Sequence, residues 1–254
     1  MSDQMTIAAY LAEGGVLSNP DNAPPRYRAE LMRMMATFVD SELAGAAGFA
    51  DVINLAPGIK ERIAAAKIVL EKTHNAEQVL AIMGDFGANT TRYANHHPWT
   101  ARLDRAADIG ATRTESDMRL AVFNYPLAGW LDAVMMNLLM GLAVDVQLGE
   151  LTRVSYQPLA EVFRAVHPIE RRHAELAAEG LARLRAQGMA HDRATAALAY
   201  WWPRVSVSFG HESSGRVTAL REWGLRHTDN AELRRAWESA ATSELAKLEL
   251  DPPA

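Results

Sequence analysis

Two pairs of glutamate and histidine in this chain have the spacing that lets each pair bind one metal ion. The pairs are Glu71 with His74 and Glu170 with His173. Residues three apart on a helix share one face, about 5–6 Å from each other. Glu42 and Asp145 each lie on the helix expected before one pair. Four carboxylates and two imidazoles inside a four-helix bundle are typical of a carboxylate-bridged di-iron centre.

The positions of the turns bring each acid opposite a pair. Glu42 lies fifteen residues before the turn at Pro57, and the first pair begins fourteen residues after it. Asp145 lies thirteen residues before the turn at Pro158, and the second pair begins twelve residues after it. Residues equidistant from the turn of a helical hairpin lie at the same height. Two docked hairpins would therefore gather all six ligands, and would leave coordination positions open for dioxygen.

A simpler interpretation competes with the metal centre. One Glu-x-x-His pair arises readily by chance in a chain of this composition, and such residues also form surface ion pairs and helix caps. The two matched pairs favour the di-iron interpretation. His96 and His97 are most simply loop residues, with contact to a substrate or a metal as the alternative.

The hydrophobic pattern predicts an all-α protein with a four-helix core and additional C-terminal helices. Residues 1–254 are expected to form a single domain. The core helices are expected at 26–50, 59–83, 126–154 and 158–186, an inserted connection at 84–122, and the C-terminal helices within 190–248. Pro203 is expected to interrupt the helix that reaches Trp201 and Trp202.

Composition excludes several classes of protein. The net charge is −5 and no basic stripe is present, so nucleic acid is not an expected partner. The chain has no cysteine, which removes disulfides and thiol catalysis and fits a reducing, cytoplasmic compartment. No signal peptide is evident. The apolar run 133–144 is too short to span a membrane and is expected to be a buried helix.

Short motifs in a fixed order give the chain a family resemblance. They include Ser41-Glu42, Ala66-Lys67-Ile68, Phe123-Asn124-Tyr125-Pro126, Ser155-Tyr156, Trp201-Trp202-Pro203, Phe209-Gly210 and Asn230-x-Glu232-Leu233-Arg234, together with the two Glu-x-x-His pairs. From about Pro25 onward the chain resembles the catalytic subunits of the phenylacetyl-CoA ring epoxidases. These are multicomponent bacterial monooxygenases of the ferritin-like superfamily.

The resemblance implies a ferritin-like bundle with two iron ions (Fe²⁺/Fe³⁺) that activate dioxygen. It implies iron ligands at Glu42, Glu71, His74, Glu170 and His173. One oxygen atom would enter an organic substrate, such as an aromatic acyl-CoA thioester, in phenylacetate catabolism or other aromatic degradation. A separate reductase with flavin and an iron–sulfur cluster would supply electrons. A helical partner subunit would pair with this chain, so an oligomer is expected.

One ligand position departs from the family pattern. The aspartate on the third helix of the family falls on Gly141, which cannot bind a metal. Asp145 lies one turn further along the same face, and we expect it to replace that ligand. The connection 84–122 is also longer than in the family, and the C-terminal tail is shorter.

These departures leave alternatives open. The chain could be a non-catalytic structural subunit of such a complex, or a stand-alone di-iron hydroxylase, N-oxygenase or ferroxidase. Coenzyme A would require cations near its phosphates. The connection offers four arginines, which could equally be ordinary solvated charges: Arg92, Arg102, Arg105 and Arg113.

Overall fold

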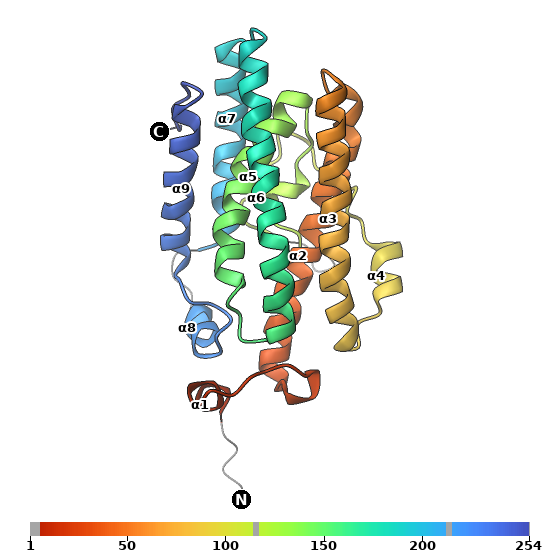
Figure 1. Cartoon of the computed structure of the whole chain (residues 1–254), viewed down its shortest axis with the longest axis vertical. Coiled ribbons are helices and arrows are strands. Elements are labelled where there is room, and N and C mark those ends of the chain that lie inside the picture. The colour runs from red at the N-terminus through yellow and green to blue at the C-terminus, as the bar shows by residue number, and fades with distance from the viewer. Residues whose placement is uncertain (1–5, 114–116, 212–214, 254) are drawn as a thin grey trace, which may run out of the picture.

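A bundle of long helices forms the protein, in a computed structural model that describes residues 6–113, 117–211 and 215–253. The two central hairpins have the bounds α2 (Pro25–Val52), α3 (Ile59–Asp85), α5 (Trp130–Leu151) and α6 (Gln157–Ala186). Helix α2 packs along α3, α5 packs along α6, and α3 also contacts α6 (Figure 1). The predicted all-α, ferritin-like class is therefore confirmed.

The remaining helices cover one end and two opposite sides of this core (Figure 1). They are α1 (Ile7–Ala12), α4 (Thr90–His96), α7 (His191–Ser206), α8 (Gly215–Glu222) and α9 (Asn230–Ala246). Helices α7 and α9 pack against α5 on the side away from α3, while α4 lies outside α3 (Figure 1). Short 3₁₀ turns η1 (Pro20–Asn22), η2 (Ile53–Leu55), η3 (Ala121–Asn124) and η4 (Val207–Phe209) join the helices.

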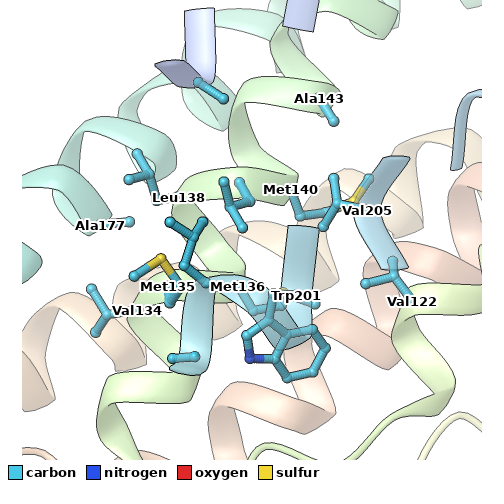
Figure 2. Close-up of a cluster of buried hydrophobic side chains, with 14 of the residues drawn as sticks. Val122, Val134, Met135, Met136, Leu138, Met140, Ala143, Ala177, Trp201 and Val205 are labelled. Atoms are coloured by element: carbon cyan, nitrogen blue, oxygen red, sulfur yellow. The ribbon is translucent and has the colours of Figure 1, made fainter. Parts of the chain in front are cut away.

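Helix α5 is the central element of the core. Met135, Leu138 and Leu139 are fully buried, and Trp201 of α7 packs into the same cluster (Figure 2). By length and composition α5 is apolar enough to cross a membrane. Its burial against α6, α7 and α9 makes it a core helix, as the sequence predicted for 133–144.

The expected boundaries hold within a few residues, with corrections at Pro126 and Pro203. The third core helix begins at Trp130 rather than at Pro126, because Asp132 Oδ2 accepts a hydrogen bond from Ala128 N and Gly129 has a φ of 158°. The connection 84–122 contains α4 and part of η3. Pro203 does not interrupt α7, which continues to Ser206 because the residues on either side of the proline are anchored in the core.

Candidate functional site

A cluster of buried polar side chains lies between α2, α3 and α6. Glu42, Glu170 and His173 are between 0% and 3% exposed, so all three lie in the bundle interior as the sequence predicted. Nε2 of His173 lies 2.8 Å from Oε2 of Glu71, and its Nδ1 lies 3.2 Å from Oε1 of Glu170. The structure thus brings together four of the six predicted ligands.

Lys72 occupies the centre of this cluster. Its ammonium lies 3.1 Å from Oε1 of Glu42 and 2.7 Å from Oε2 of Glu170, and its side chain is 6% exposed. Asn75 Nδ2 donates to Oε1 of Glu170 at 2.9 Å. An ammonium ion therefore bridges two of the four carboxylates that were expected to bind iron.

The other two predicted ligands lie outside the cluster. The side chain of His74 is 70% exposed and lies 3.2 Å from Glu77. Asp145 is 30% exposed, lies 2.7 Å from Nε2 of His167 and forms an ion pair with Arg171 at 2.9 Å. Gly141, at the position of the family's aspartate, lies directly against Ala174 of α6.

Sequence reasoning missed Lys72 and Asn75, although a signal for them was present. Ala65, Ile68 and Val79 are buried on α3, and they recur at the helical period. Position 72 belongs to that stripe, whereas position 71 falls on its flank and position 74 on the exposed side of the helix. The lysine is buried because the apolar residues of α3 determine the rotation of the helix.

The charges of the cluster are balanced without a metal. Burial and the neighbouring Glu170 raise the pKa of Glu42 to about 8. Burial by itself would lower the pKa of the Lys72 ammonium group. The attraction of Glu170 and Glu42 is larger than this effect of burial and raises that pKa. Burial alone would raise the pKa of Glu170, but the ammonium of Lys72 and the neighbouring His173 lower it. Glu42 therefore takes up a proton more readily than an ordinary carboxyl group, beside the Lys72–Glu170 ion pair.

This arrangement does not fit two iron ions. A cation already lies between Glu42 and Glu170, and of the two predicted histidine ligands only His173 faces the interior. Oε2 of Glu42 is buried and has no hydrogen-bond partner in the part of the chain that the structure describes. A protonated carboxyl group with a pKa near neutrality can donate or accept a proton, which is a property of general acid–base groups.

A cavity of about 430 Å³ reaches Glu42 from the surface. Phe38, Met140 and Val144 contribute to its mainly apolar lining, between α2, α5 and α8. Its rim carries three arginines, which are Arg33, Arg113 and Arg216. Burial, followed by repulsion from Arg216 and Arg33, lowers the pKa of Arg113. A cavity of this kind suits an apolar group with an anionic tail.

Arg113 donates to Thr37 at 2.7 Å, and two of the other arginines proposed for coenzyme A also have structural partners. Arg102 donates to the carbonyls of Trp99 and Ala44, and Arg105 forms an ion pair with Asp132. The side chain of Arg92 lies outside the part of the chain that is described, as does that of His96.

Comparisons with known proteins agree with this architecture. A profile of the family described as "Phenylacetic acid catabolic protein" matches residues 5–254. The chain belongs to this family. It is also similar to one of the subunits of the 1,2-phenylacetyl-CoA epoxidase of Escherichia coli (strain K12). The two are 24% identical over 259 residues, which cover 100% of this chain and 78% of that protein. The family resemblance seen in the sequence is thereby confirmed, and it supports an oxygenase-type function in phenylacetate catabolism.

Proposed function

We propose that this protein is a helical subunit of an oxygenase of the phenylacetyl-CoA epoxidase type and binds an acyl-CoA thioester. The observation that carries the proposal is the cavity between α2, α5 and α8. Its apolar depth suits an aromatic or related acyl group, and the arginines at its rim suit the phosphates of coenzyme A. The similar Escherichia coli protein is named for phenylacetyl-CoA.

The bundle interior favours a subunit without its own iron pair. Lys72 supplies the positive charge that Glu170 requires, and protonation removes the charge of Glu42. Oxygen activation would then belong to another subunit of the complex, supplied with electrons by a reductase. Glu42 would close the inner end of the cavity and could donate a hydrogen bond to the ligand.

Calorimetric titration with phenylacetyl-CoA tests ligand binding. We expect saturable binding by the wild type. We expect Arg113→Gln to weaken it about tenfold or more, because a charge-assisted hydrogen bond contributes about 1.5–3 kcal/mol. Arg235→Gln is the matched control, since Arg235 is exposed on α9 and does not line the cavity. Equal affinities for the two variants, or no binding by the wild type, would remove the acyl-CoA proposal.

A second candidate is a di-iron oxygenase in which Lys72 withdraws when metal binds. Glu42 and Glu170 lie within hydrogen-bond distance of Lys72. His173 lies within hydrogen-bond or ion-pair distance of Glu71 and Glu170. This convergence favours the second candidate. When bound, the irons would supply dioxygen activation. Lysine side chains are flexible, so Lys72 is the group that would have to move.

Iron content after anaerobic ferrous loading separates the two candidates. If the protein is a subunit without its own iron pair, Glu42, Glu170 and His173 should bind little iron in the wild type. They should bind more iron in Lys72→Met, because that variant lacks the bridging cation. About two irons per wild-type chain, lost in Glu170→Gln and accompanied by oxygen uptake with a reductase, would favour the second candidate.

A further inference from the structure

Asp40, His97 and Asp117 form a second cluster of potential metal ligands, apart from the candidate site. Asp40 lies on α2, His97 directly follows α4, and Asp117 precedes η3. Nε2 of His97 lies 3.1 Å from Oδ2 of Asp40 and 3.7 Å from Oδ1 of Asp117. Two residues along a helix correspond to a rotation of about 200°, so Asp40 points away from the cluster that contains Glu42.

His97 and Asp40 of this second cluster are buried, but the contacts within the cluster do not satisfy all of their hydrogen-bonding atoms. The side chain of His97 is 5% exposed and that of Asp40 is 2% exposed. Among the described residues, neither ring nitrogen of His97 has a hydrogen-bond partner, and neither does Oδ1 of Asp40. Nε2 and Oδ2 are close enough for a hydrogen bond but are not oriented for one. Ligands whose lone pairs converge on a common ion have this geometry.

Neighbouring groups hold each of the three side chains in place. The ring of His97 stacks between Tyr93, at 5.2 Å, and Trp99, at 5.9 Å. Met118 N donates to Oδ2 of Asp40 at 2.5 Å. Arg119 donates to both oxygens of Asp117, through its backbone N at 3.0 Å and its Nε at 2.5 Å. Hydrogen bonds of this kind from outside orient carboxylate ligands in metal sites.

The charge balance leaves room for a cation. Arg119 is 1% exposed and compensates the carboxylate of Asp117, while the carboxylate of Asp40 remains. Arg113 and Arg102 are near enough to act electrostatically on Asp40 and Asp117 respectively, but their guanidinium groups donate to other partners. A neutral histidine with two carboxylates is a donor set for Zn²⁺ and related divalent ions.

We propose that Asp40, His97 and Asp117 bind one divalent transition-metal ion of the Zn²⁺ class. Bonds of about 2.0–2.1 Å to a tetrahedral ion place neighbouring ligand atoms about 3.4 Å apart, close to the 3.1 and 3.7 Å separations of His97 from the carboxylates. The fourth position is left for water. The ion attaches the connection between α3 and α5 to α2, beside Met118 and Leu120 in the cavity wall.

Titration of chelator-treated protein with ZnCl₂ tests the proposal. We expect about one Zn²⁺ per wild-type chain, and a loss of affinity of about 100-fold or more in His97→Gln and in Asp40→Asn. His191→Gln is the matched control, because His191 is an exposed histidine at the start of α7, and its affinity should equal that of the wild type. Absence of zinc binding by the wild type, or equal affinity in His97→Gln, would overturn the site.

Two further measurements keep the result unambiguous. Circular dichroism shows whether each variant folds. If His97→Gln does not fold, X-ray absorption of the Co²⁺-loaded wild type replaces the titration of that variant. The spectrum should show one histidine nitrogen among oxygen ligands. A coordination shell without histidine would overturn the proposal. Glu170→Gln should retain zinc binding, whereas loss of zinc in that variant alone would place the ion among the ligands around Lys72.

Discussion

At the scale of single residues, Lys72 is the side chain on which the bundle interior depends. Replacing it with methionine removes the only cation within hydrogen-bond distance of Glu170 among the described contacts and leaves that carboxylate buried. We expect Lys72→Met to lower the free energy of unfolding by about 3–5 kcal/mol. Urea denaturation in the presence of a chelator measures the change.

The same helix provides the control for this prediction. Lys67 is 54% exposed and its ion pair with Glu71 spans 3.6 Å. Lys67→Met should therefore change the free energy of unfolding by no more than about 0.5 kcal/mol. Similar changes in the free energy of unfolding for the two substitutions would mean that Lys72 contributes no more to stability than a lysine on the surface.

Glu42 should make stability depend on pH. Its pKa is about 8 in the folded protein and is taken as 4.5 in the unfolded chain. The folded state therefore holds a proton that the unfolded state releases between these values, and the free energy of unfolding falls as pH rises from about 5 to 8. The decline should be on the order of 3 kcal/mol.

Denaturation curves of Glu42→Gln, measured across the same pH range, test this assignment. Glutamine keeps the shape of a protonated carboxyl group but cannot titrate, so the decline should become much smaller. A decline of equal size in the variant would assign the effect to another group.

At the scale of helices, the close contact between α5 and α6 depends on Gly141. A Cβ at this position would lie 2.8 Å from Cβ and 3.1 Å from Cα of Ala174, and backbone cannot yield as a flexible side chain can. We expect Gly141→Ala to lower the free energy of unfolding by about 1–3 kcal/mol. Gly149→Ala, on the same helix, has only ordinary contact at 3.6 Å with His167 and should be neutral or stabilising by up to about 1 kcal/mol. Thermal unfolding of both variants compares them.

Helix rotation also explains which parts of the site could be predicted from the sequence. Periodicity and turns determine where helices lie, so Glu42, Glu170 and His173 were correctly placed in the interior. The spacing of Glu71 and His74 shows that they share a face, but the packing of α3 decides which face is buried. His74 is consequently exposed, and whether it binds metal remains a prediction.

Asp145 shows a second limit of sequence-based prediction. Asp145 and Glu170 are nearly equidistant from the turn at Pro158. Asp145 accordingly lies level with this part of α6, where it contacts His167 and Arg171. The side chains of His167 and Arg171 are 18% and 57% exposed, whereas Glu170 is 1% exposed, so Asp145 meets the outer side of α6 and not the buried cluster. The cluster of Asp40, His97 and Asp117 depends on the path of a long connection, which no local pattern determines.

At the scale of the whole molecule, the cavity is built by elements distant in sequence. Leu220 of α8 and Leu225 after it line one wall, while Phe38 of α2 and Leu148 of α5 line others. Helix α8 is joined to the bundle partly through Gly224 O, which accepts from Ser155 N. A ligand in the cavity would therefore connect α8 to the central hairpins. The position of α8 would then depend on whether the cavity is occupied.

Binding should consequently stabilise the protein as a unit. Phenylacetyl-CoA at about 100 times its dissociation constant should raise the free energy of unfolding by about 2.7 kcal/mol. Phenylacetate, which lacks the phosphates, should have little effect at the same concentration. Hydrogen exchange should slow in residues 216–225 and along the cavity face of α2, because these segments meet across the ligand. Stabilisation without protection of α8 would place the ligand elsewhere on the molecule, whereas equal stabilisation by phenylacetate would show that the arginines at the rim do not recognise coenzyme A.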